Sequence, residues 1–234
     1  MVNNWLNIIQ DKLLPPTCLL CGNHGRPGRD LCLPCQETLP RNTDCCRQCA
    51  SPFATGTARH SGLCGSCLAR PPAFDQTFAP YLHHGAMRHL IAMLKFHGRF
   101  HHARILGTLL ADYLRDTAEI PDLIIPVPLH PGRYRQRGFN QALEIARIVA
   151  RQLQAPLDIQ SCHRQRNTRH QTGLNARQRR ANMTGAFAMR RPLSARHAAI
   201  LDDVMTTGST THELARTLKR AGVVRVDVWT CSRA

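Results

Sequence analysis

One stretch of this 234-residue chain decides its fold, Ile200-Leu201-Asp202-Asp203-Val204-Met205-Thr206-Thr207-Gly208-Ser209-Thr210. The apolar residues 198–201 predict a buried strand, and two carboxylates stand at its carboxyl end. Adjacent carboxylates cannot both be buried without partners, so we expect Asp202 and Asp203 to face a ligand. Ionised carboxylates only accept hydrogen bonds, and the hydroxyls of a ribose are suitable donors for them.

The five residues Thr206-Thr207-Gly208-Ser209-Thr210 have the chemistry of an anion site. They supply hydroxyls and backbone N–H groups at the start of a helix expected over residues 210–220, where the helix dipole favours an anion. Carboxylates that can bind the ribose hydroxyls thus stand next to a loop that can bind a phosphate. This arrangement predicts binding of a ribose 5-phosphate group. The alternative is a helix capped by Ser209 or Thr210, preceded by turn-forming aspartates. The stretch lacks the Lys of a Walker A loop, which argues against a kinase or ATPase.

The region around this stretch alternates strands with helices. The apolar pattern predicts strands over residues 76–82, 122–127, 157–159, 185–189, 197–201 and 224–230. It predicts helices over residues 85–95, 103–115, 138–153, 176–181 and 210–220, and a polar loop directly after residue 127. Such alternation indicates an α/β fold with a mostly parallel sheet flanked by helices, which binds ligands at the carboxyl ends of its strands.

Nine of the eleven cysteines lie between Cys18 and Cys67, so the N-terminal part follows a different chemistry. Paired C-x-x-C turns complete a tetrahedron of thiolates, and in a reducing compartment they favour structural zinc over disulfides. The spacing predicts two four-cysteine zinc sites: Cys18, Cys21, Cys32 and Cys35 in the first, and Cys46, Cys49, Cys64 and Cys67 in the second. Cys45 is a spare that could replace Cys46 only by changing the spacing to C-x3-C.

These patterns divide the chain into two domains. Residues 1–70 should hold a docking helix over residues 4–13 and a double zinc ribbon. Residues 71–234 should hold the sheet. The formal net charge of +16 favours polyanionic partners, namely nucleic acid, nucleotides or phosphorylated sugars, although a solvated Arg-rich surface would give the same value. Since no apolar run is long enough to span a bilayer, we expect a cytoplasmic protein.

The strand, acidic pair and threonine-rich loop resemble the signature of the type I phosphoribosyltransferases. The resemblance implies that Asp202 and Asp203 bind the ribose 2- and 3-hydroxyls of 5-phosphoribosyl pyrophosphate, which makes them the candidate catalytic residues. It further implies that residues Thr206, Thr207, Gly208, Ser209 and Thr210 bind the 5-phosphate, and that Mg²⁺ bridges ribose and pyrophosphate oxygens. The members that salvage 6-oxopurines carry an Asp where this chain has Thr206, so hypoxanthine or guanine salvage loses support.

The same resemblance implies two further loops. One follows the first sheet strand and contacts pyrophosphate, and the other is a basic loop over residues 164–180 that closes on the site or, alternatively, is a disordered loop. The basic loop contains Arg166, Arg169, His170, Gln171 and Arg177. The residues that we assign to pyrophosphate or acceptor contacts are Val127, Pro128, Arg137, Asn140, Gln141 and Arg166.

Two zinc ribbons before a phosphoribosyltransferase-like domain resemble the ComF family of competence proteins, including its DNA-utilisation relative GntX. Leu94-Lys95-Phe96, Arg137-Gly138-Phe139-Asn140-Gln141 and the loop at Asp202 follow the family order. The resemblance implies a role in natural transformation or use of external DNA, with single-stranded DNA and DNA-uptake or recombination proteins as partners.

Two functions remain open at this point. The chain could be a phosphoribosyltransferase of unknown acceptor, or a non-catalytic protein that senses 5-phosphoribosyl pyrophosphate and binds nucleic acid. The aromatic content of 5% weakens the second interpretation, because it provides few rings on which nucleic-acid bases could stack. A purely structural scaffold is a third interpretation, but it leaves the acidic pair and the threonine loop without a purpose.

Overall fold

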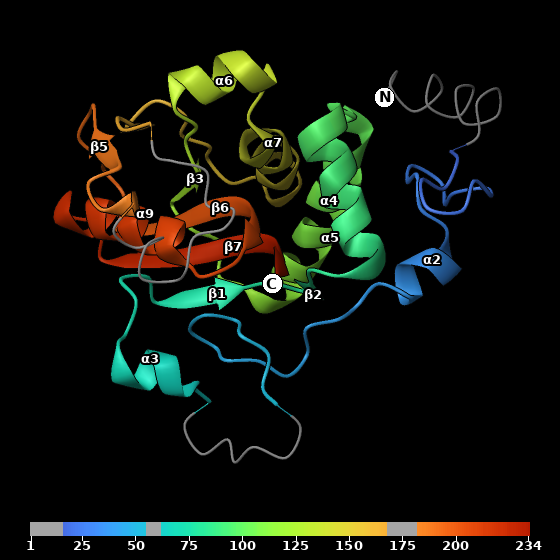
Figure 1. Cartoon of the computed structure of the whole chain (residues 1–234), viewed down its shortest axis with the longest axis horizontal. Helices are drawn as coiled ribbons and strands as arrows, with labels where there is room; N and C mark the ends of the chain where they lie inside the picture. The colour runs from blue at the N-terminus through green and yellow to red at the C-terminus, as the bar shows by residue number, and fades with distance from the viewer. Residues whose placement is uncertain (1–15, 55–61, 168–181) are drawn as a thin grey trace.

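The computed structural model describes residues 16–54, 62–167 and 182–234 (Figure 1). The helices expected over residues 4–13 and 176–181 lie outside these ranges, as do Arg169, His170, Gln171 and Arg177 of the expected basic loop. All eight cysteines assigned to zinc and the whole of the acidic stretch are among the described residues.

A five-stranded parallel sheet forms the centre of the molecule (Figure 1). Its strands are β1 (Gln76–Phe78), β2 (Tyr81–Leu82), β3 (Leu123–Pro126), β6 (His197–Met205) and β7 (Arg225–Arg233). The order is β1-β7-β6-β3, with β2 also paired to β7, and every pair is parallel. The predicted α/β class with a mostly parallel sheet is therefore confirmed.

Helices cover both faces of this sheet because side chains alternate along each strand. Ala199 and Leu201 of β6 pack in the core with α4 (Gly85–His97), α5 (Phe100–Thr117) and α7 (Gln141–Leu153). Ala198 and Ile200 pack on the other face with α9 (Ser209–Arg220). The predicted positions of these four helices agree with the structure to within a few residues.

Three predicted segments differ from the structure. The expected polar loop after residue 127 contains α6 (Pro131–Arg137), which begins at a proline and receives a cap from the His130 ring. The expected strand over residues 157–159 is only an isolated bridge between Leu157 and Ile124. An antiparallel pair, β4 (Cys162–Arg164) with β5 (Phe187–Met189), follows it instead. The expected strand over residues 76–82 is divided into β1 and β2, which both pair with β7.

The cysteine-rich segment packs directly on the sheet domain (Figure 1). Its short helices, α2 (Leu33–Glu37) and α3 (Gly65–Ala69), each begin directly after a cysteine. The first half packs on α5, where Arg29 forms an ion pair with Asp112 at 2.7 Å. The second half packs on β1, where the Thr77 hydroxyl donates to the Gln48 carbonyl at 2.7 Å. The two halves thus support different parts of the sheet domain.

Candidate functional site

The acidic pair lies inside β6, which continues beyond the expected end at residue 201 because Asp202 and Val204 still pair with β7. Asp202 is partly exposed, whereas Asp203 is only 4% exposed. Its partner is Lys95 at the end of α4, whose Nζ lies 3.7 Å from Asp203 Oδ2. Among the described residues, Oδ2 has no hydrogen-bond donor. Lys95 thus gives Asp203 a charged partner inside the protein, and the expectation that both carboxylates face a ligand stays a prediction.

The two carboxylates influence each other's ionisation. Burial and the negative charge of Asp203 raise the pKa of Asp202 well above its usual value. Burial also opposes ionisation of Asp203, but the Lys95 ammonium and a hydrogen bond with Asp202 outweigh it and lower the pKa of Asp203. With both carboxylates ionised, the pair would carry one more negative charge than Lys95 offsets. A hard cation with oxygen ligands, such as Mg²⁺, fits this deficit.

The loop after the pair leads into α9. Gly208 adopts a left-handed conformation with φ of 72°, and an added Cβ would lie 2.7 Å from Met205 Cε. Thr206 and Thr207 are exposed, and the Thr207 hydroxyl lies 2.8 Å from the Ser209 hydroxyl. Gly208 is the N-cap of α9, so the expected alternative of capping by Ser209 or Thr210 is not what the structure shows. The loop places hydroxyls at the positive end of a twelve-residue helix.

One further cation, Arg164, stands near the pair. Arg164 on β4 is 7% exposed and lies over the Phe187 ring, with its guanidinium carbon 5.8 Å from the ring centroid. Burial and the charge of Arg133 lower the pKa of Arg164 to about 10, while the charge of Asp202 opposes that shift. Arg164 is thus a buried cation within electrostatic range of Asp202, in a position that suits an anionic ligand.

Arg233, the penultimate residue of the chain, joins the loop to the second cysteine cluster. Its Nε donates to the carbonyl of Cys49 at 3.0 Å, and its Nη1 donates to the carbonyl of Met205 at 3.0 Å and to that of Thr206. From the sequence, neither Arg233 nor Lys95 is expected to have a role here. Lys95 is singled out only within the Leu94-Lys95-Phe96 motif, and its place at the end of an amphipathic helix is the available signal.

Of the residues assigned to pyrophosphate, Val127 and Pro128 lie where β3 ends, beside β6. Val127 donates its N–H to the Leu201 carbonyl at 2.9 Å, and Asn140 Nδ2 donates to the Val127 carbonyl at 3.0 Å. Arg137 donates to Gln141 Oε1 at 2.6 Å. Arg166 is exposed and donates to the Thr184 carbonyl. These bonds fix the shape of the loop, and its contact with a ligand stays a prediction.

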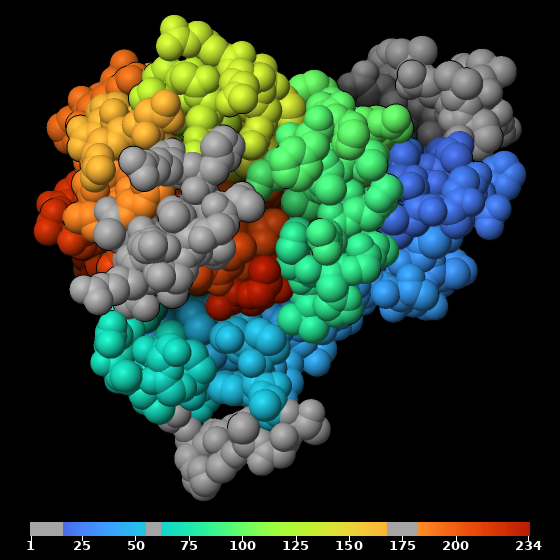
Figure 2. All heavy atoms as spheres, in the orientation of Figure 1, coloured from blue at the N-terminus to red at the C-terminus, as the bar shows by residue number. Residues whose placement is uncertain are grey.

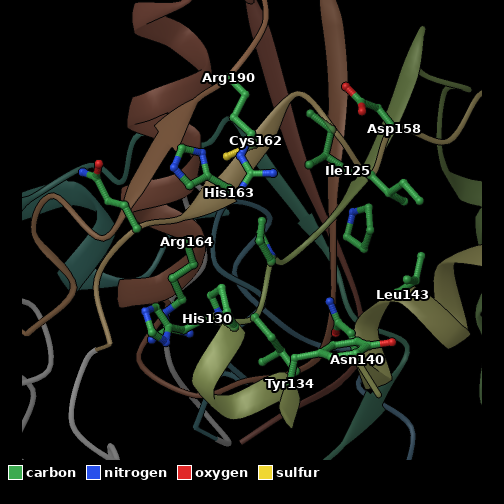
Figure 3. A pocket seen from close by; sticks show the side chains of 16 residues that line it. Ile125, His130, Tyr134, Asn140, Leu143, Asp158, Cys162, His163, Arg164 and Arg190 are labelled. Atoms are coloured by element: carbon green, nitrogen blue, oxygen red, sulfur yellow. The ribbon is translucent and has the colours of Figure 1, made fainter. Parts of the chain in front are cut away.

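A pocket of about 440 Å³ opens beside this loop (Figure 3). Tyr134 and Asn140 lie at one end, and Cys162, His163 and Arg190 lie at the other (Figure 3). Pro128 and Arg164 also line it, but neither the acidic pair nor the residues of the threonine loop do. The volume falls in the range of about 300–1,000 Å³ that is typical of small-molecule sites. The pocket is therefore separate from the threonine loop.

Both predicted cysteine clusters are assembled. Within each, the four Sγ atoms lie within 4.8 Å of one another. Cys21 Sγ and Cys32 Sγ are 3.7 Å apart, and Cys49 Sγ and Cys64 Sγ are 3.6 Å apart, close to the separation of about 3.8 Å that tetrahedral Zn–S bonds of about 2.3 Å give. The geometry fits structural zinc and is too long for disulfides.

The same geometry shows which of Cys45 and Cys46 belongs to the second cluster. Cys46 belongs to the second cluster, whereas Cys45 Sγ points to the Asn42 carbonyl at 3.8 Å. Burial would raise the pKa of Cys46, but backbone hydrogen bonds outweigh it and lower that pKa to about 7. The C-x2-C spacing is therefore the correct one for this cluster.

Comparison with known proteins extends over nearly the whole chain. Residues 9–70 match the double zinc ribbon domain family. The chain is 36% identical over 227 residues to the DNA utilization protein YhgH of Escherichia coli O157:H7, covering 94% of this chain and 98% of that protein. It is 33% identical over 226 residues to competence protein F of Haemophilus influenzae, covering 93% and 96%. With competence protein ComFC of Bacillus subtilis it shares 24% identity over 203 residues, covering 84% and 81%.

Solved structures show partial likeness to the fold. One is the glutamine phosphoribosylpyrophosphate amidotransferase of B. subtilis complexed with ADP and GMP, with a TM-score of 0.37 and 19% identity over 54% of this chain and 25% of that chain. Another is a purine phosphoribosyltransferase from Pyrococcus horikoshii Ot3, with a TM-score of 0.34 and 15% identity over 56% and 82%. Within the described residues, no helix has the length and apolar character needed to cross a membrane.

Proposed function

The chain belongs to the family of competence protein F and the DNA utilization protein YhgH, and from that premise we propose that it binds 5-phosphoribosyl pyrophosphate with Mg²⁺ and handles single-stranded DNA. The names of these relatives place them in competence and DNA utilisation. Their similarity covers both the zinc ribbons and the sheet domain, so the proposal concerns the whole chain.

The acidic pair carries the proposal for the sugar ligand. Asp203 Oδ2 is buried without a hydrogen-bond donor among the described residues, and the pKa of Asp202 is raised by burial and by Asp203. Ribose hydroxyls would donate to these oxygens and Mg²⁺ would neutralise their surplus charge. Lys95 already offsets part of that charge. A divalent cation would neutralise the rest, and the ribose diol would supply the missing hydrogen-bond donors.

The other roles follow from position. The hydroxyls and N–H groups of residues 206–210 would hold the 5-phosphate at the start of α9. Arg164 and Pro128 line the same pocket, which supports assigning pyrophosphate to this side. The predicted roles of Val127, Pro128, Arg137, Asn140, Gln141 and Arg166 are therefore retained in the proposal. If the bond to pyrophosphate breaks, these cations would stabilise the charge that develops on the leaving group.

Calorimetric titration tests the ligand directly. 5-Phosphoribosyl pyrophosphate is titrated into the full-length zinc protein with and without Mg²⁺. We expect saturable binding that requires Mg²⁺ and is lost in Asp202→Asn and Asp203→Asn. Glu119→Gln is a matched control, because Glu119 is an exposed carboxylate outside the site. Unchanged binding in both aspartate variants would rule the site out.

A pyrophosphate-release assay separates an enzyme from a sensor. The 440 Å³ pocket beside the loop favours an enzyme, because it gives an acceptor a place next to Arg164. The protein is incubated with the sugar pyrophosphate, Mg²⁺ and either nucleobases, nucleotides or single-stranded DNA. Release that depends on one acceptor identifies a phosphoribosyltransferase, whereas binding without release in every mixture identifies the non-catalytic sensor.

A further inference from the structure

Two surface segments without acidic residues meet at the edge of the sheet domain. Residues 76–111 contain no Asp or Glu, and neither do residues 123–143. Each segment carries several arginines, and those exposed to solvent include Arg88, Arg99, Arg104 and Arg135. The first segment includes α4, most of α5 and the corner between them, and the second includes α6 and the start of α7. Arg104 pairs with Asp30 of the cysteine-rich segment, so Arg88, Arg99 and Arg135 supply the positive charge that attracts a polyanion.

Exposed aromatic rings lie within this basic surface. Phe96 is 71% exposed, Phe100 is 53% exposed and Tyr134 is 49% exposed. The Phe100 ring contacts the ring of Phe139 edge-on, with centroids 5.0 Å apart, so the start of α5 touches the link between α6 and α7. Figure 2 shows the two segments, green and yellow-green, side by side on one face. We call Phe96, Arg99, Phe100, Tyr134 and Arg135 the aromatic–basic track.

We propose that the aromatic–basic track binds single-stranded DNA, with its rings stacking on bases and its arginines pairing with phosphates. The inference rests on the DNA-handling part of the proposed function and specifies where the strand binds. A single strand presents the faces of its bases, whereas a duplex hides them, so rings spaced among cations select the single strand. Lys95, next to Phe96, pairs with Asp203, and the track therefore begins at the rim of the acidic site.

The stacking contribution is measured with fluorescein-labelled (dT)20 and the full-length zinc protein by fluorescence anisotropy. We expect Phe96→Ala and Tyr134→Ala each to weaken binding by about 5- to 150-fold, the cost of one lost base–aromatic stack. Phe96→Trp should keep near-native affinity, because an indole stacks as well as a phenyl ring. Phe96 is largely exposed, and Tyr134 is about half exposed and belongs to no core cluster, so these substitutions leave the core intact.

The phosphate contribution is measured as salt dependence. Arg99→Gln and Arg135→Gln should each reduce the slope of log affinity against log salt by about 0.7, the value for one phosphate contact with a single strand. Arg151→Gln at the far end of α7 and Val224→Ala before β7 are matched controls. Arg151 is exposed and Val224 is 63% exposed, but both lie outside the track, so neither should change affinity or slope.

The outcomes separate this inference from the proposed function. If the native protein binds (dT)20 but all four track variants bind it equally well, the track is wrong and the strand lies elsewhere, for example on the zinc ribbons. Equal competition by a duplex of the same sequence would also overturn it. If the native protein binds no single strand, both the track and the DNA-handling proposal fail, while the calorimetric result for the sugar pyrophosphate stands by itself.

Discussion

At the scale of single residues, Asp202 and Asp203 place two carboxylates beside one lysine. Because burial and Asp203 raise the pKa of Asp202, its charged form is less favourable in the folded protein than in the unfolded chain. The free energy of unfolding should therefore decrease as pH rises from the usual carboxyl range toward the raised pKa of Asp202. Asp203 changes the free energy of unfolding with pH in the opposite direction, since Lys95 lowers its pKa and folding favours its charged form.

This difference predicts opposite stability effects for two conservative substitutions. Asp202→Asn should raise the melting temperature near pH 8, by about 2–4 °C for each kcal/mol of repulsion removed, with a smaller gain near pH 5. Asp203→Asn should lower the melting temperature because it leaves Lys95 without its carboxylate. Thermal denaturation of both variants at the two pH values checks this. Destabilisation by Asp202→Asn at pH 8 would contradict the proposed repulsion.

Gly208 gives a second prediction at this scale. Gly208→Ala adds left-handed strain and places a Cβ 2.7 Å from Met205 Cε, so it should cost more than about 1 kcal/mol and weaken binding of the sugar pyrophosphate. Gly222→Ala is the control, because Gly222 has φ of 100° but no atom within 4 Å of an added Cβ. Urea denaturation and calorimetry are the measurements. If both variants lose the same stability, backbone strain alone explains the loss, and the contact of the added Cβ with Met205 contributes nothing.

At the scale of elements, the two cysteine clusters support different parts of the protein. The second is joined to the threonine loop by Arg233, which donates to the Cys49 carbonyl and to the Met205 carbonyl. The first packs against α5, where Arg29 pairs with Asp112. Loss of one zinc ion should therefore have a local effect that depends on which cluster loses it.

Amide hydrogen exchange with metal analysis tests this difference. A Cys46→Ser/Cys49→Ser variant should hold one zinc ion and show exchange in residues 205–210 that is about tenfold faster, the loss of about 1.4 kcal/mol that one charged hydrogen bond supplies. A Cys18→Ser/Cys21→Ser variant should also hold one zinc ion but keep native exchange in that loop. Equal acceleration in both variants would contradict the bridge through Arg233.

Some elements could be predicted from sequence because their signal is local. α4, α5, α7 and α9 have amphipathic periodicity, and the cysteine spacing specified both clusters. α6 buries no residue and so has no apolar face to detect, and β4 is short and contains the charged Arg164. The acidic pair was identified, but Lys95 and Arg233 reach it from other elements. Their positions depend on tertiary packing, which local sequence patterns do not reveal.

At the scale of the whole molecule, the cysteine-rich segment and the sheet domain share one core. Cys18, Leu31 and Leu39 are at most 2% exposed and belong to the same cluster of buried residues as Tyr81 and Leu106. The predicted division into residues 1–70 and 71–234 describes the sequence, and it stays a prediction as a statement about independent folding. A shared core favours cooperative unfolding of both parts.

Calorimetric scanning with a zinc chelator tests that cooperativity. We expect a single transition for the zinc-loaded chain, because separating the two parts would expose Leu31 and Leu39 to water. Chelation should lower that transition by about 10 °C or more, since structural zinc contributes several kcal/mol to folding and each kcal/mol corresponds to about 2–4 °C in a chain of this size. Two transitions, of which the upper is insensitive to the chelator, would instead show a sheet domain that folds without its zinc ribbons. In that case the buried contacts of Leu31 and Leu39 would contribute little to the stability of the sheet domain.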